Sequence, residues 1–197
     1  MIVLDKIVLA SRNPNKIEEM DALFSGLGIK VYSALDFPEL EEVEEDEPTL
    51  EGNALKKARY VHQVTGLPAL SDDTGLEVTA LNGAPGVFSA RYAGENASYQ
   101  DNVLKLLEAM LDKADRKAQF RTVLALVTSN EELTFDGICA GEIISEQKGS
   151  SGFGYDPIFK PNGFNETFAE LDSSTKNEIS HRGRAAQELL KFLKTQS

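Results

Sequence analysis

Hydrophobic and polar positions change their period twice near the start of the chain. Residues 6–11 form a short apolar run typical of a buried strand. Asn13 and Pro14 then supply an N-cap followed by proline at the first helical position, and apolar residues recur at helical spacing behind them. We therefore predict a strand over 6–11, a helix over 14–27 and a second strand over 29–33.

The next part of the chain opens with a run of seven acidic residues within 39–47, which repel one another and predict a solvated loop. Thr49 can cap a second helix, whose apolar residues lie near one face until Gly66 ends it. Residues 68–71 then lead into a strand and a turn, and residues 76–81 have an extended pattern.

The second half of the chain continues to mix the two periods. Residues 98–111 are amphipathic, and two β-like runs over 119–129 and 133–145 predict an antiparallel hairpin. A glycine-rich loop over 149–157 follows, and a capping box at 175–178 precedes the last helical stripe. The pattern predicts an α/β fold with a mixed central sheet and flanking helices.

Length and composition fit one globular domain spanning residues 1–197, with 41% hydrophobic residues. The longest aliphatic run, residues 123–127, is far shorter than the roughly 20 residues that cross a bilayer. Cys139 is the sole cysteine, so no intrachain disulfide or thiolate metal cluster can form. We expect a cytoplasmic protein that does not engage a membrane.

The formal net charge of −12 argues against a general nucleic-acid binder, because affinity for the phosphate backbone comes mainly from lysine and arginine. A small anionic substrate is still possible if cations cluster locally and a divalent metal bridges protein carboxylates to phosphate.

Two segments could bind phosphate or metal. Residues 11–16 run from a strand end into a helix start and carry a lysine, an arrangement that binds anions; the alternative is an ordinary capped helix, since Walker glycines are missing. In residues 71–75, Asp72 and Asp73 stand side by side before a glycine that permits a tight turn. Close carboxylates suggest a divalent cation or a shared proton, and the alternative is an exposed Asx turn.

Two later segments could bind a base. In residues 152–157, glycines allow the backbone to approach a ligand while Phe153 and Tyr155 offer faces for stacking; the alternative is a plain loop with buried aromatics. Residues 180–184 are basic, with Lys176 one turn earlier, and the alternative is a solvated helix start.

Together these four segments resemble the inosine triphosphate pyrophosphatase family, from Ser11 to Arg184. The motifs at 83–86, 89–92 and 120–121 are also similar to that family. The resemblance implies two lobes with an active-site cleft between them, a homodimer, and Mg²⁺-dependent hydrolysis of nonstandard purine nucleoside triphosphates (ITP, dITP and XTP) to the monophosphate and pyrophosphate.

The resemblance also implies residue roles. Asp73 is the expected general base. The expected magnesium ligands are Asp73, Asp72 beside it, and Glu45, which lies near the family's other magnesium-binding glutamate. The expected substrate-binding residues are Ser11, Arg12, Asn13, Pro14, Asn15, Lys16, Lys57, Thr74, Phe153, Gly154, Tyr155, Asp156, Lys176, His181 and Arg182.

Selectivity should come from donors placed for a 6-keto purine, with backbone amides, His181 and Arg182 as candidates, because adenine presents donors where an acceptor is needed. The chain departs from the family at Gly52, where glutamate is common, and at Ser11, where threonine is commoner. Two rival functions are a phosphomonoesterase with Asp72 or Asp73 as nucleophile and a noncatalytic nucleotide-binding module.

Overall fold

The computed structural model describes residues 4–24 and 28–196. Among these, seven strands form one sheet in the order β2-β1-β3-β5-β6-β7, with β4 paired to β3. The strands are β1 Lys6–Leu9, β2 Lys30–Ser33, β3 Ala69–Val78, β4 Pro85–Gly86, β5 Lys117–Val127, β6 Glu132–Ile143 and β7 Phe159–Pro161. The helices are α1 Pro14–Phe24, α2 Leu50–Thr65, α3 Tyr99–Ala109, α4 Ser173–Ile179 and α5 His181–Gln196.

The sheet is mixed, as the sequence predicts. Strand β1 pairs in parallel with both β2 and β3, whereas β4 pairs antiparallel with β3 and β7 pairs antiparallel with β6. The predicted hairpin is confirmed as β5 and β6, whose connecting turn is closed by the Thr128 N–H donating to the Glu131 carbonyl at 2.9 Å.

The chain divides into two compact units. Unit 1 comprises residues 4–24, 28–73, 122–137 and 182–196 of the described chain, and unit 2 comprises residues 74–121 and 138–181. Strands β3, β5 and β6 contribute residues to both units. The single domain predicted from the sequence, and the cleft between two lobes, stay predictions.

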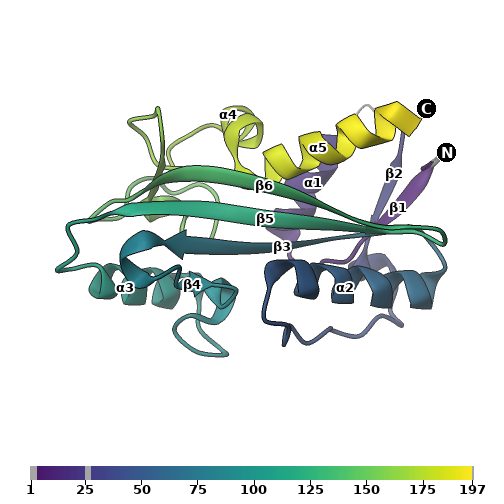
Figure 1. Cartoon of the computed structure of the whole chain (residues 1–197), viewed down its shortest axis with the longest axis horizontal. Coiled ribbons are helices and arrows are strands. Elements are labelled where there is room, and N and C mark those ends of the chain that lie inside the picture. Colours follow the sequence, from purple (N-terminus) through teal and green to yellow (C-terminus); the bar gives the residue numbers. More distant parts are fainter. Residues whose placement is uncertain (1–3, 25–27, 197) are drawn as a thin grey trace. The chain divides into compact units, whose positions relative to one another are not determined.

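In unit 1, helices cover both faces of the sheet, with α2 on one side and α1 and α5 on the other (Figure 1). The α1/α5 side forms a core in which Met20 and Phe24 from α1 pack with Leu70 of β3 and Leu189 of α5. Parallel strands buried on both faces read as apolar runs, which explains the short hydrophobic pattern of β1.

In unit 2, a second core gathers residues from α3, β5, β7 and the loop before α4. Val103, Leu106 and Met110 supply the buried side of α3 and its C-cap. Phe120, Phe159 and Phe168 form a contiguous aromatic cluster with ring centroids 4.7 to 5.9 Å apart.

Two predicted helices are confirmed by their caps, and the acidic run 39–47 has neither helix nor strand. The Thr49 hydroxyl accepts from the Gly52 N–H at the start of α2, and Gly66 ends that helix at φ 67°. Ser98 caps α3 in the same way. The first helix begins at Pro14 as predicted and is described to Phe24, so its predicted end at residues 25–27 lies outside the described residues.

Four expectations are wrong. Residues 71–75 do not form a turn, because β3 continues through them to Val78; likewise residues 79–81 form a 3₁₀ turn instead of extended chain. The last helix does not start from a capping box at Thr175, since Asp172 is the N-cap and accepts the Thr175 N–H. Ser180 has an extended ψ of 158° and divides the predicted single helix into α4 and α5.

No helix among the described residues is long and apolar enough to cross a membrane.

Candidate active site

The opening loop leaves β1 at the carboxyl end of a parallel strand and enters α1, a place where phosphate sites are common in α/β folds. The Asn13 side chain accepts from the Asn15 N–H at 3.0 Å, which confirms it as the cap of α1. The Ser11 hydroxyl accepts from the Asn13 N–H at 3.2 Å and tightens the same turn. Lys16, on the first turn of α1, projects its ammonium to Asp72 at 3.2 Å.

Arg12 has a different environment from the rest of this loop. Its guanidinium donates to the Leu40 carbonyl at 2.5 Å, so it holds the start of the acidic run. Because Arg12 donates to a protein carbonyl here, its binding to phosphate stays a prediction.

Asp72 and Asp73 are neighbours in sequence but lie on opposite faces of the sheet. Side chains alternate along a strand, so consecutive residues of β3 point to different sides. Leu70 and Asp72 face α1 and α5, whereas Ser71 and Asp73 face α2. The interpretation of the two acids as an exposed turn is therefore wrong: Asp72 is 2% and Asp73 5% exposed.

On the α2 side, two carboxylates converge on one ammonium. Lys57 donates to Glu45 at 2.6 Å, to Asp73 at 2.9 Å and to the Asp72 carbonyl at 2.9 Å. Burial alone would lower the pKa of Lys57, but Asp73 and Glu45 raise it above its usual range. Glu45 is the half-buried member of the acidic run, and the other six acids are exposed.

The two carboxylates of this group differ in basicity. Burial raises the pKa of Asp73 to about 6, helped by the charge of Glu45 and opposed by Lys57. Burial also acts to raise the pKa of Glu45, but attraction and hydrogen bonding from Lys57 outweigh it and lower that pKa. Asp73 is thus the more basic group and the better proton acceptor near neutral pH.

On the α1/α5 side, Asp72 accepts from Arg182 Nε at 3.2 Å and Nη2 at 3.0 Å, and it also pairs with Lys16. Glu19 of α1 accepts from the Nη1 of the same arginine. Burial would raise the pKa of Asp72, but Lys16 and Arg182 hold it well below its usual range. The alternative for residues 180–184 is a solvated basic helix start. That interpretation is wrong for His181 and Arg182, which are 4% and 2% exposed.

A divalent metal can be tested against these contacts. The Lys57 ammonium already marks a point where carboxylate oxygens of Glu45 and Asp73 meet, and hard oxygen donors suit Mg²⁺. Within the described residues no group of three His, Cys, Asp or Glu side chains forms a ready metal cage. Mg²⁺ commonly takes only one or two carboxylates together with waters and substrate phosphates, so Glu45 and Asp73 fit it. Asp72 is less suited because two cations already neutralise it.

In unit 2, a buried carboxylate organises the glycine-rich loop. Asp156, 3% exposed, accepts the Phe153 N–H at 2.9 Å and the Lys176 ammonium at 2.8 Å. Gly152 has φ 74°, and a side chain there would overlap the Asp156 carboxylate. The Lys176 ammonium also lies 5.3 Å from the centre of the Phe153 ring. These contacts join two of the predicted segments into one cluster.

Three other predicted residues of unit 2 have distinct settings. The Tyr155 ring is 5% exposed, and its hydroxyl donates to the Ser89 carbonyl at 2.9 Å, so the ring is part of the core and not an open stacking face. His181 stacks on Phe120 with ring centroids 4.5 Å apart. Thr74 is half-buried on β3.

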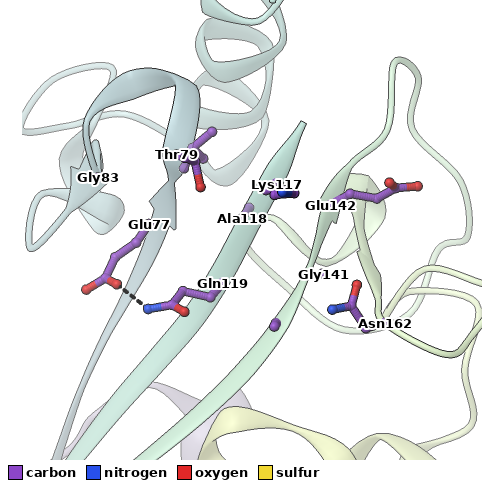
Figure 2. Close-up of a pocket in the computed structure, with 11 residues that line it drawn as sticks. Glu77, Thr79, Gly83, Lys117, Ala118, Gln119, Gly141, Glu142 and Asn162 are labelled. Atoms are coloured by element: carbon purple, nitrogen blue, oxygen red, sulfur yellow. Dashed lines mark hydrogen bonds between the residues drawn. The ribbon is translucent and has the colours of Figure 1, made fainter. Parts of the chain in front are cut away.

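A groove in unit 2 is separate from these residues. It has a volume of about 560 Å³ and is lined by β3, β5 and β6, with Asn162 at its side (Figure 2). Gln119 donates to Glu77 at 2.7 Å across part of its wall. Neither aromatic side chains nor any predicted site residue line it, so it does not carry the predicted chemistry.

Two residues of the unit 1 cluster were missed by the sequence analysis. Glu19 lies one helical turn after Lys16, and this spacing is the only signal that could have suggested it. Asn53, 1% exposed, donates to Asp73 Oδ2 at 3.4 Å, and a polar residue among the apolar positions of α2 was its available signal.

Comparison with known proteins gives a consistent picture. The sequence model of the Ham1 family matches residues 7–192. A dITP/XTP pyrophosphatase of Flavobacterium johnsoniae is 48% identical over 188 residues, covering 95% of this chain and 97% of the relative.

Solved structures agree with this result. A HAM1 protein from Coxiella burnetii has a TM-score of 0.89 and 46% identity, covering 98% of this chain and all of that protein. The Ham1 protein of Staphylococcus aureus has a TM-score of 0.88 and 39% identity, covering 98% of this chain. The predicted α/β fold is thereby confirmed.

Proposed function

Because this chain belongs to the Ham1 family, we propose that it hydrolyses the nonstandard purine nucleoside triphosphates ITP, dITP and XTP to the monophosphate and pyrophosphate. The relative that is 48% identical over nearly the whole chain is a dITP/XTP pyrophosphatase, which supports the assignment as a hydrolase of phosphoric anhydrides.

The observation that carries the proposal is the buried group formed by Asp73, Lys57 and Glu45. Asp73 has a raised pKa near 6, so it is ionised at neutral pH yet basic enough to take a proton from water. We assign Asp73 as the general base for attack of water on the α-phosphorus.

Glu45 and Asp73 would hold the metal, and a bound Mg²⁺ would offset phosphate charge and polarise the attacked group. Phosphoryl and nucleotidyl transfer depend largely on such positioning and charge stabilisation. Lys16 and Lys57 supply protein cations for the phosphate chain, and Arg182 and Glu19 keep Asp72 and Lys16 in place. The overall site remains acidic without the metal, with four carboxylates and three cations in this cluster.

For the purine, the proposal rests on unit 2 and on Arg182 of unit 1. The loop at 152–156 is held by Asp156 and Lys176, with backbone amides, Phe153 and Gly154 available to a base. His181 and Arg182 are proposed as donors to the 6-keto oxygen. For Arg182 this role adds to its contacts with Asp72 and Glu19, since a guanidinium has five N–H donors.

The decisive experiment is an assay of pyrophosphate and orthophosphate release from ITP, XTP, dITP, GTP and ATP. We expect pyrophosphate from the first three. Orthophosphate would instead indicate a phosphomonoesterase, and Mg²⁺-dependent binding of ITP without turnover would indicate a noncatalytic module.

Asp73→Asn should lower kcat by at least about 10²–10⁴, as expected for loss of a catalytic base. Asp101→Asn makes the same chemical change in the exposed cap of α3 and should retain turnover. Near-normal pyrophosphate release by Asp73→Asn would remove Asp73 from the mechanism.

We also propose that the protein works in the cytoplasm as a homodimer, on the strength of the family resemblance. Light scattering should then give a mass of about twice the 21.5 kDa of one chain.

A further inference from the structure

Asn53 is a buried amide that connects the acidic loop to the catalytic strand. Its Oδ1 accepts from the Glu47 N–H at 3.0 Å, and its Nδ2 lies 3.5 Å from the Glu47 carbonyl. The same Nδ2 donates to Asp73 Oδ2 at 3.4 Å. One side chain on the first turn of α2 therefore contacts both the segment that carries Glu45 and the proposed general base.

Gly52 allows the acidic loop to lie against α2. A Cβ added at Gly52 would lie 2.8 Å from the Glu47 Cβ and 3.2 Å from its Cγ. Because the Glu47 Cβ is fixed to the backbone, a side chain at position 52 requires the loop to move. The glycine that departs from the family pattern is therefore a packing requirement of this loop.

The acidic run needs such an attachment. Its residues repel one another, and 39–47 has no strand or helix to hold it. Asn53 fixes the end of the run with hydrogen bonds and adds no further negative charge beside Asp73 and Glu45. It also engages Asp73 Oδ2, while Asp73 Oδ1 accepts from Lys57 at 2.9 Å, so the orientation of the carboxylate is defined on both oxygens.

We propose that Gly52 and Asn53 form a docking point that sets Glu45 relative to Asp73, with Asn53 acting as a positioning residue for the metal-binding carboxylates. This inference rests on the proposed function, since it assigns Asn53 a task in that reaction. Partners that orient metal ligands typically change metal affinity or activity by about 10–100-fold when removed.

The test compares Asn53→Ala with Asn102→Ala. Asn102 is a matched control because it is 2% exposed and lies on the first turns of α3. Its side chain also holds a loop through the backbone, with the Ala93 N–H at 2.7 Å and the Ala90 carbonyl at 3.0 Å. Both variants lose a buried amide that fastens a loop, but only Asn53 contacts Asp73.

Two readouts separate positioning from general stability. Mn²⁺ binding to the nucleotide-free protein is followed by electron paramagnetic resonance, and kcat and KM for ITP are measured at saturating Mg²⁺. For Asn53→Ala we expect Mn²⁺ affinity and kcat each to fall by about 10–100-fold, with KM changed less than about threefold. Asn102→Ala should lower Tm similarly but leave both quantities at the wild-type level.

Gly52→Ala keeps the inference testable if Asn53→Ala does not fold. Alanine has the higher helix propensity, so α2 itself should not weaken, but the new Cβ must displace Glu47. We expect Mn²⁺ affinity and kcat to fall by about tenfold in a variant whose helix is intact.

The inference is overturned if Asn53→Ala or Gly52→Ala binds Mn²⁺ and turns over ITP as the wild type does, or if the wild type itself does not bind Mn²⁺. Failure of the proposed function is distinct, because the wild type would then release no pyrophosphate from ITP.

Discussion

Asp72 and Asp73 are adjacent and have the same side chain, but their pKa values are shifted in opposite directions. Asp72 is held ionised by Lys16 and Arg182, which lower its pKa despite burial, whereas burial raises the pKa of Asp73 to about 6. Because strand alternation places them on different faces, each meets a different set of charges. Asp72 is therefore an anchoring carboxylate and Asp73 a basic one, so different surroundings give one residue type two roles.

Asp73→Asn should make the metal-free protein more stable at neutral pH. The folded-state pKa of Asp73, about 6, lies above the ordinary value of 3.8, so its contribution to stability is present below pH 4 and is lost as pH rises through 6. Asparagine removes that loss, and we expect a gain on the order of 1–3 kcal/mol at pH 7.5. Urea unfolding of both proteins in EDTA at pH 7.5 and pH 4 measures the difference, which should vanish at the lower pH. A difference in unfolding free energy that does not depend on pH would contradict this role of the Asp73 pKa.

His181→Phe should narrow discrimination between ITP and ATP. Phenylalanine can keep the stack on Phe120 but has no donor for a 6-keto oxygen. Loss of a neutral hydrogen bond, about 0.5–1.5 kcal/mol, predicts a fall of up to about tenfold in the ratio of kcat/KM values. The chain's other histidine gives the control. His62, on α2, forms a hydrogen bond with the Leu67 carbonyl, and His62→Phe should leave the ratio unchanged. Equal losses for both nucleotides in His181→Phe would assign His181 to structure.

At the scale of elements, caps decide where helices begin and end. Ser180 separates α4 from α5, so the chain starts a new helix at His181 and places the buried His181 and Arg182 in its first turn. The preceding helix, α4, is capped by Asp172, three residues before the threonine that the sequence pattern favoured. A carboxylate at the N-cap satisfies an orphan N–H and interacts favourably with the helix dipole.

The cap of α4 can be tested directly. Asp172→Ala should lower the free energy of unfolding by about 0.5–2 kcal/mol, because the Thr175 N–H loses its acceptor. Thr175→Ala keeps that N–H and its acceptor and loses only an exposed side-chain contact to Asp172, so its cost should be smaller. Chemical denaturation of the two variants measures both values, and the reverse order would restore Thr175 as the cap.

At the scale of the whole molecule, a net charge of −12 makes the protein dependent on cations near its substrate. The chain passes between units 1 and 2 after Asp73, Arg121, Gly137 and His181, so the candidate motifs supply residues to both units. Each unit has its own core and its own cluster of ionised groups.

Mg²⁺ should stabilise the folded protein. A ligand at ten times its Kd stabilises by about 1.4 kcal/mol, which is roughly 3–6 °C in Tm for a chain of this size. Differential scanning calorimetry with Mg²⁺ is compared with Na⁺ at equal ionic strength, because an acidic protein also gains from simple screening. Equal shifts with the two ions would contradict a specific site, and Asp73→Asn should abolish the Mg²⁺ increment.

The sequence by itself determined most of the elements. A proline after an asparagine cap predicted the start of α1, and a threonine before and a glycine after an amphipathic run predicted both ends of α2. Each of these signals acts within one turn, so none needs tertiary information. The motifs likewise indicated the family and the proposed base, because residue order along the chain carries that resemblance.

Only the tertiary structure decided the settings of the acids. Local composition made residues 71–75 read as a turn, yet pairing with β1 and β4 at the two ends of β3, together with burial between helices, extends them as a strand. Tertiary contacts join residues up to 110 positions apart. They bring Glu45 and Asp73 to Lys57, Asp72 to Arg182, and Asn53 to Glu47. Such contacts depend on which faces of the elements pack together, a property that no local pattern in the sequence records.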